Sequence, residues 1–184
     1  MARFHYKSTI EDINFDASRG LDRTAILRLA ECDFVKKRET VLITGSTGVG
    51  KRYLATALGY QACIHGYRVG YYNASKLFVK FKMAKADGSY LKELAKLERQ
   101  HVILLDDFGL QTLDSQNRIT LLEIIEDHHN KGSIIVTSQI PVKGWYDIIG
   151  ERTIADAVLD RLIHLSHRIE LQGESMRKKR SITH

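Results

Sequence analysis

Eight residues in the first third of the chain have the types and spacing needed to hold phosphate groups. They follow an apolar run at residues 41–43 and precede a helical pattern that starts at Tyr53. The glycines allow a tight turn whose N–H groups face the β- and γ-phosphates, and the helix N-terminus adds positive potential. The alternative is an ordinary glycine-rich turn. The pattern predicts that ATP or ADP binds to Gly45, Ser46, Thr47, Gly48, Val49, Gly50, Lys51 and Arg52.

The last position of this loop departs from the usual pattern. A Ser or Thr normally follows the lysine, because its hydroxyl holds Mg²⁺. Arg52 stands there instead, and a guanidinium has no acceptor for a metal and repels one. The loop backbone and Lys51 are unaltered, so nucleotide binding is expected to survive. We therefore expect weak Mg²⁺ dependence and slow hydrolysis.

Two acidic residues end a second strong signal, at residues 101–107. Its consecutive apolar residues are typical of a strand buried on both faces, as in a parallel sheet. Such folds place their chemistry at the carboxyl ends of strands. We expect Asp106 to hold Mg²⁺, directly or through water, and Asp107 to orient or deprotonate the attacking water. The alternative is a plain strand followed by a turn.

Strand patterns alternate with helical patterns along the chain. Strands are predicted at 41–43, 69–73, 101–107, 133–139 and 168–171. Helices are predicted at 22–37, 53–65, 76–86, 91–99, 115–130 and 153–163, with Asp22, Ser75 and Thr153 at the starts of three of them. The fourth strand ends in Ser138 and Gln139, which could contact the γ-phosphate or the attacking water. The alternation predicts an α/β P-loop NTPase fold with a doubly wound, mainly parallel five-stranded sheet flanked by helices.

Composition limits the partners and the compartment. The 184 residues suffice for one domain, and a net charge of +6 favours an anionic partner such as nucleic acid, although a solvated basic surface is the alternative. The positive charge gathers at 76–85 and 177–180. Cys32, Cys63 and Trp145 are expected to pack in the interior. No apolar run reaches about 20 residues and the start lacks a signal-peptide core, so we expect a cytoplasmic protein without a membrane partner.

Five stretches occur together in an order that points to a known family. They are the phosphate loop and residues 104–107, 136–141, 157–162 and 168–177. With them the sequence resembles the IstB-like ATP-binding helper proteins of insertion-sequence transposition, which are relatives of the DnaC and DnaI helicase loaders within the AAA+ ATPases. The resemblance extends from about residue 3 to residue 180, and its last two stretches are the most specific.

The resemblance implies an AAA+ ATPase core at residues 41–173, with little or no separate lid domain. An N-terminal extension and leading helix would occupy 1–40, and a basic tail 174–184. It implies a homo-oligomer that assembles on double-stranded DNA with ATP, bends the DNA, and recruits or activates a transposase. It also implies roles by position: the acidic motif at Asp106 and Asp107, a γ-phosphate sensor at Ser138 or Gln139, an arginine finger at Arg161 that reaches a neighbouring subunit's nucleotide, and a second sensor at Arg177.

Several alternatives stay open. Without the resemblance, Arg161 would be interpreted as a surface salt-bridge partner of Asp160. Family members usually carry a helical segment before the ATPase module, whereas this sequence begins at about the module's own start. An ATPase is the leading interpretation, and a nucleotide-binding switch with little hydrolysis is an alternative that Arg52 supports. A helicase-loader-like ATPase is a close alternative, although residues 173–180 favour the transposition family. A small-molecule kinase is a further alternative, but it would need an arginine-bearing lid for which the sequence offers no candidate.

Overall fold

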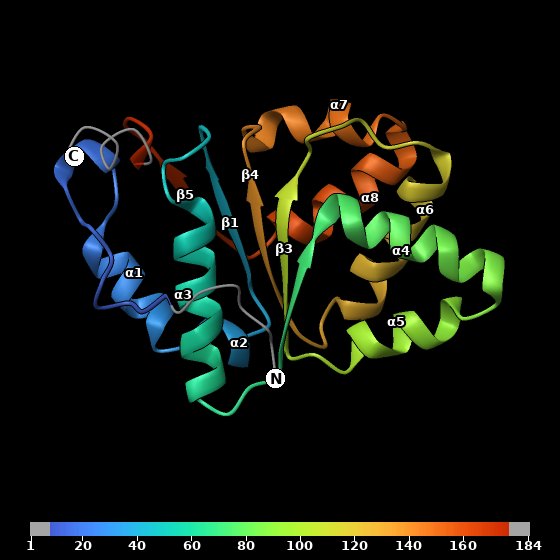
Figure 1. Ribbon diagram of the computed structural model, residues 1–184, viewed down its shortest axis with the longest axis horizontal. Coiled ribbons are helices and arrows are strands. Elements are labelled where there is room, and N and C mark those ends of the chain that lie inside the picture. The colour runs from blue at the N-terminus through green and yellow to red at the C-terminus, as the bar shows by residue number, and fades with distance from the viewer. Residues whose placement is uncertain (1–7, 177–184) are drawn as a thin grey trace, which may run out of the picture.

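The computed structural model describes residues 8–176, which form a five-stranded sheet with helices on both faces (Figure 1). The strand order is β2-β3-β4-β1-β5, and all neighbouring strands run parallel. The strands are β1 (Thr40–Gly45), β2 (Val69–Asn73), β3 (Val102–Phe108), β4 (Ser133–Ser138) and β5 (Ser166–Leu171). The predicted doubly wound parallel sheet is therefore confirmed, with all five strands close to their expected places.

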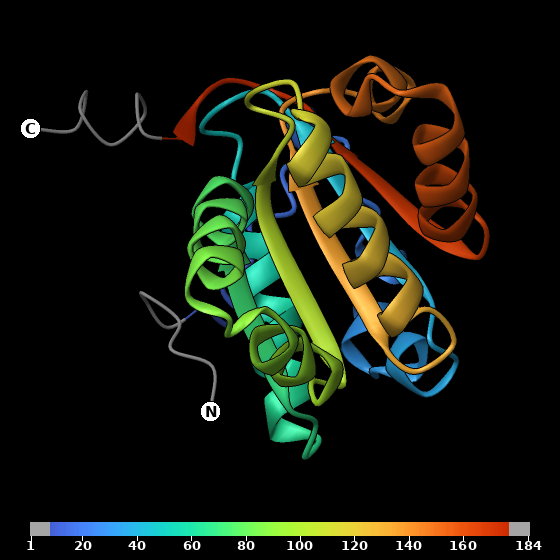
Figure 2. The same ribbon diagram turned by 90° about the vertical axis from the view of Figure 1, so that its right-hand side faces the viewer.

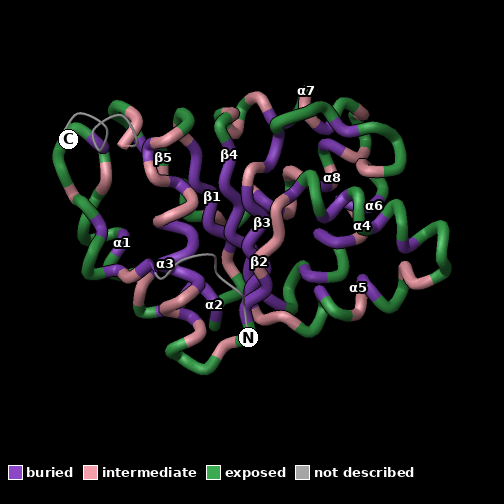
Figure 3. The backbone as a smooth tube through the Cα atoms, viewed as in Figure 1, coloured by how far each residue is buried: buried purple, intermediate pink, exposed green. Residues whose placement is uncertain are grey.

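Alternate strand residues face two apolar clusters, one on each side of the sheet. On β1, Val41 and Ile43 join the first cluster and Leu42 joins the second. The first cluster contains residues of α1 (Arg23–Ala30), α2 (Asp33–Lys36) and α3 (Lys51–Ile64). The second contains residues of α4 (Ala74–Asp87), α5 (Tyr90–Glu98), α6 (Ser115–His128), α7 (Trp145–Ile149) and α8 (Arg152–Ile163). The central strands β1, β3 and β4 are thus buried on both faces (Figure 3), which explains their continuous apolar runs, whereas the edge strand β5 is largely exposed. Figure 2 shows the sheet and its flanking helices from the side.

Helix boundaries differ from the sequence prediction in three places. The single helix expected to run from Asp22 to Lys37 is two helices, because Cys32 adopts a left-handed backbone with φ 61° between α1 and α2. Helix α4 is capped by the Asn73 side chain, not started by Ser75. Helix α8 is capped by the Glu151 carboxylate, not by Thr153. Two short 3₁₀ turns, Ala17–Arg19 and Val142–Gly144, complete the elements.

Trp145 packs in the interior, as expected. Its side chain is fully buried, its indole N–H donates to the Ile140 carbonyl at 2.8 Å, and its ring meets the edge of Phe108. Cys32 is also fully buried, whereas Cys63 is only partly so, and both are free thiols. Within residues 8–176, no helix has the length and apolar character needed to cross a membrane.

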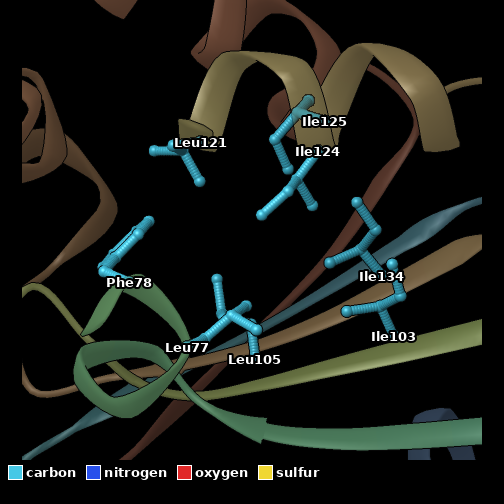
Figure 4. A pocket seen from close by; sticks show the side chains of 8 residues that line it. All are labelled: Leu77, Phe78, Ile103, Leu105, Leu121, Ile124, Ile125 and Ile134. Carbon is cyan, nitrogen blue, oxygen red and sulfur yellow. The ribbon is translucent and has the colours of Figure 1, made fainter. Parts of the chain in front are cut away.

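The space between the sheet and helices α4 and α6 is filled with apolar side chains. Figure 4 shows them pointing toward one another around a cavity of about 10 Å³. A cavity of that size holds about one water molecule at most. Its lining is entirely apolar, so this region is core and not a ligand site. The lining residues are Leu77, Phe78, Ile103, Leu105, Leu121, Ile124, Ile125 and Ile134.

The parallel arrangement brings the polar strand ends to one edge of the sheet. The carboxyl ends of the strands point to the top of Figure 1. At this edge the chain leaves β1 after Gly45, and Asn73 pairs with Asp106 across β2 and β3. Ser138 is the last residue of β4, the strand that lies between β3 and β1. This edge therefore carries the predicted functional residues of β1, β3 and β4.

Candidate nucleotide-binding site

The phosphate loop connects β1 to α3 at this edge. Gly45 has φ 148°, and a Cβ at this position would lie 2.4 Å from the backbone oxygen of Leu171 on β5. Gly50 has φ 97° and stands at the N-cap of α3, which begins at Lys51. Only glycine fits the first position without displacing backbone, and the second conformation also favours it. These two glycines therefore allow the tight turn between β1 and α3.

Lys51 lies over the inside of the loop. Its side chain is largely buried, and its Nζ donates to the Ser46 carbonyl at 2.7 Å. Burial lowers the pKa of Lys51, while the negative charges of Asp107 and Asp106 act in the opposite direction. The ammonium is therefore already held at the loop, where it can bind a polyphosphate as a compact charge.

Segments from both ends of the described chain support the loop. The Arg19 guanidinium is mostly buried and donates to the carbonyls of Asn14 at 2.5 Å and Val49 at 2.7 Å. Near the other end, the Met176 N–H donates to the Gly48 carbonyl at 2.9 Å. The sequence did not indicate Arg19, because it lies in a polar, irregular stretch without a motif. Arg177, the expected second sensor, lies outside the described residues.

An irregularity in β3 places the two acidic side chains together. The register with β4 shifts between Leu105 and Phe108, and Asp107 has a left-handed φ of 57°. In a regular strand, neighbouring side chains point to opposite faces. The bulge instead brings both carboxylates within reach of one side chain, that of Arg52. Asparagine and aspartate tolerate this backbone better than other non-glycine residues.

Asp106 is fully buried, and three side chains donate to it. Thr137 Oγ1 donates to Oδ1 at 2.6 Å, while Tyr71 Oη and Arg52 Nε donate to Oδ2, both at 2.5 Å. Burial and then the hydrogen bond to Asp106 raise the pKa of the Tyr71 phenol, so it stays a proton donor. Tyr71 and Thr137 were missed from the sequence, although both lie on strands that flank β3.

Arg52 bridges the two carboxylates. Its Nε lies 2.5 Å from Asp106 Oδ2 and its Nη2 lies 2.5 Å from Asp107 Oδ2. Burial lowers the pKa of Arg52, but the charge of Asp106 and the hydrogen bond to it outweigh burial, so the pKa is raised overall. Asn73 adds a long contact of 3.4 Å to Asp107. The guanidinium is therefore a fixed cation between the loop helix and the acidic strand end.

This arrangement does not fit a Mg²⁺ ion. Mg²⁺ needs near-octahedral oxygen ligands at about 2.0–2.1 Å. Both oxygens of Asp106 accept hydrogen bonds from protein donors, and a cation already lies between Asp106 and Asp107. Among residues 8–176, His, Cys, Asp and Glu side chains nowhere form a group of three or more that could hold a metal. The expected metal position is therefore taken by the Arg52 guanidinium.

The two expected sensor residues lie in different surroundings. Ser138 is fully buried, donates to the Phe108 carbonyl at 2.6 Å and accepts from the Ile140 N–H. Gln139 is exposed, and its Oε1 accepts from Thr47 Oγ1 of the phosphate loop at 2.7 Å. The structure therefore brings Gln139 to the loop and keeps the Ser138 hydroxyl in contacts with the backbone.

Arg161 lies away from the phosphate loop of its own chain. It stands near the end of α8, where it donates to the Ala157 carbonyl at 2.8 Å and pairs with Glu126 at 3.0 Å. The partner is Glu126, not Asp160. Arg161 lines a hollow together with Thr40, the first residue of β1, whereas the loop follows the last residue of that strand. Six strand residues span about 20 Å, so its own nucleotide is out of reach.

The parallel five-stranded sheet, the loop between β1 and α3, and the acidic end of β3 define a P-loop NTPase fold of the AAA+ type. A family model described as IstB-like ATP binding protein matches residues 1–183. The chain belongs to this family.

Relatives and solved structures agree with this assignment. A Sinorhizobium fredii protein, named as an insertion sequence ATP-binding protein, is 42% identical over 96% of this chain and 72% of its own length. A Pseudomonas aeruginosa protein, named as an insertion sequence IS21 ATP-binding protein, is 33% identical over 97% of this chain and 67% of its own length. The DnaC helicase loader has the same fold, with a TM-score of 0.77 at 20% identity over 90% of this chain and 97% of that chain. AMPPCP-bound DnaA from Aquifex aeolicus has a TM-score of 0.75 at 19% identity, over 96% of this chain and 54% of that chain.

Proposed function

We propose that this protein binds ATP and ADP and uses the nucleotide to assemble on duplex DNA, where it assists a transposase. The observation that carries the proposal is the preformed phosphate loop, with Lys51 held against Ser46 at the start of α3. Membership of the IstB-like family and relatives named for insertion sequences support the transposition context.

Each candidate residue has a proposed part. The loop backbone and Lys51 bind the phosphates, and Gln139, which contacts Thr47, senses the γ-phosphate. Once the Asp107 carboxylate leaves its ion pair with Arg52, Asp107 orients or deprotonates the attacking water. Arg161 acts on a neighbouring subunit's nucleotide, because its own is too far away. Arg177 stays a candidate second sensor, and Ser138 a sensor only if its two backbone contacts open.

We propose DNA binding from the net charge of the chain more than from the lysines of α4. Lys80 pairs with Glu93 and Lys82 with Asp114, both at 2.5 Å, and Lys85 lies over the Tyr90 ring. Two of the lysines at 76–85, Lys80 and Lys82, are thus paired with carboxylates, which compensate part of the positive charge there. The proposed phosphate contacts therefore rest chiefly on the overall charge of +6 and on the basic residues 177–180.

A nucleotide switch with little turnover is a second candidate. Arg52 favours it, because the residue proposed as the base, Asp107, is held in an ion pair at 2.5 Å. The two candidates differ in turnover and agree in nucleotide binding.

Radiolabelled ATP binding and turnover, each measured with and without duplex DNA, test both candidates. Lys51→Ala should abolish nucleotide binding, whereas Lys92→Ala, which removes an exposed lysine of α5, should leave it unchanged. Turnover stimulated by DNA would support the ATPase, and binding with negligible turnover the switch. A wild-type chain that binds neither ATP nor ADP would contradict the proposed function.

A further inference from the structure

The acidic pair at the end of β3 is neutralised by the protein itself. Arg52 contacts Asp106 through Nε and Asp107 through Nη2, and Lys51, the residue before it, lies close enough for both carboxylates to affect its pKa. Two negative charges thus face two positive charges. In most P-loop proteins a divalent cation between phosphate and carboxylate supplies much of this compensation.

The Arg52 guanidinium also has a face left for a ligand. Its Nη1 takes part in neither ion pair, and the side chain is 40% exposed while Asp106 beneath it is 1% exposed. Arg52 lies in the first turn of α3, next to the lysine that the loop presents to phosphates. Planar guanidinium groups bind phosphate oxygens well. The same residue can therefore hold the carboxylates on one side and a phosphate on the other.

We propose that Arg52 is a built-in replacement for the divalent cation, so that this protein binds nucleotide as the metal-free polyphosphate. This inference rests on the proposed nucleotide binding and states how that site achieves it. A metal at Asp106 would have to displace Arg52 and then remain beside its positive charge. Arg52 binds the acidic strand end directly and joins α3 to β3 without an ion between them.

The first experiment measures ATP and ADP dissociation constants in EDTA and in millimolar Mg²⁺. For the wild type we expect constants that agree within about threefold. Arg52→Ser restores the metal-binding hydroxyl and removes the built-in cation, so Mg²⁺ should tighten its binding of ATP by about tenfold or more. A wild type whose binding tightens tenfold or more with Mg²⁺ would overturn the proposal, whatever the variant does.

The second experiment needs no nucleotide. Mn²⁺ is titrated into the apo protein and free Mn²⁺ is followed by electron paramagnetic resonance, with the melting temperature measured in parallel. The wild type should bind no Mn²⁺ and keep its melting temperature, whereas Arg52→Ser should bind Mn²⁺ and be stabilised by it. If Arg52→Ser does not fold, Arg52→Gln, which also removes the charge, replaces it.

The matched control is Arg38→Ser. Arg38 is exposed, precedes the first residue of β1 and donates to the Asn130 carbonyl, whereas the acidic pair lies near the last residue of β3. Removal of the Arg38 side chain therefore leaves the Arg52 ion pairs in place. It should behave as the wild type in both experiments. Mn²⁺ binding by the wild type at the affinity of Arg52→Ser would overturn the inference. Absence of nucleotide binding in every condition would contradict the proposed function, while the Mn²⁺ measurement would still decide the part played by Arg52.

Discussion

Removing the Arg52 side chain should destabilise the protein measurably. In Arg52→Ala, Asp106 keeps its hydrogen bonds from Tyr71 and Thr137 but loses its counter-ion in a fully buried position. Hydrogen bonds to charged groups contribute about 1.5–3 kcal/mol each. The Asp107 arm is more exposed, at 24%, and is screened by water, so it adds only about 0.5 kcal/mol. Because the Arg52 side chain is 40% exposed and partly screened by water, the lower end applies, and we expect a total loss of about 2 kcal/mol in the free energy of unfolding.

Urea unfolding at neutral pH measures this loss, and a double-mutant cycle assigns it. Asp106→Asn removes the charge but keeps the shape, so Arg52→Ala should cost less in that background, by about 1 kcal/mol or more. The melting temperature of Arg52→Ala should fall by about 4–8 °C, as expected for a domain of this size. A loss below about 0.5 kcal/mol, with no coupling to Asp106, would show that water screens both ion pairs and that Arg52 is not fixed between the carboxylates.

Three further predictions follow from other parts of the chain. Burial lowers the pKa of His128 to about 4, while its Nε2–H donates to the Ser133 carbonyl at 3.2 Å. The unfolded chain then binds the proton more readily, so the free energy of unfolding should fall by up to about 3 kcal/mol as pH drops from about 6.5 towards 4. In urea titrations, His128→Gln should lose most of this pH dependence. Arg161→Ala should leave nucleotide affinity intact but reduce ATP-dependent oligomerisation in light scattering, whereas Glu126→Ala, which breaks the same ion pair, should not; lost affinity in a monomeric sample would contradict action in trans. Replacing Lys178, Lys179 and Arg180 by Ala should flatten the salt dependence of duplex binding in anisotropy titrations, whereas replacing the paired Lys80 and Lys82 should change it less.

Local signals were sufficient for the frame of this site. The glycines at 45, 48 and 50 predicted the loop because their backbone conformations leave few other residues possible. The apolar runs predicted the strands because a sheet buried on both faces needs continuous apolar segments. Parallel order then placed Asp106 and Gln139 at the same edge as the loop. The helix break at Cys32 was not predictable, because nothing about a cysteine indicates a left-handed backbone.

The contacts between distant side chains were not available from the sequence. From the sequence, Arg52 is expected to disturb metal binding because it lacks a hydroxyl and repels a cation. The structure adds that Arg52 takes the carboxylates for itself. This contact depends on the register shift between Leu105 and Phe108, which turns Asp106 and Asp107 toward the same side chain. A one-residue irregularity in strand pairing has no signature in residue type, and Thr137, which holds it, looked like an ordinary strand residue.

Thr137 provides the sharpest test of that irregularity. Its Oγ1 accepts from the Asp107 N–H at 3.0 Å and donates to Asp106 Oδ1 at 2.6 Å, so one hydroxyl joins both residues of the bulge. Thr137→Val keeps the size and removes both hydrogen bonds. A bond to a charged group and one to a backbone amide together suggest a loss of about 3 kcal/mol.

Thr44→Val is the matched control for this loss. Thr44 is also buried, lies on the neighbouring strand β1, and donates no side-chain hydrogen bond to another residue within the described chain. Its substitution should therefore leave the free energy of unfolding within about 0.5 kcal/mol of the wild type, because no side-chain hydrogen bond to another described residue is lost. If urea unfolding gives Thr137→Val and Thr44→Val the same stability, the hydroxyl of Thr137 does not hold the bulge, and the side-by-side placement of Asp106 and Asp107 must come from the Arg52 ion pairs alone.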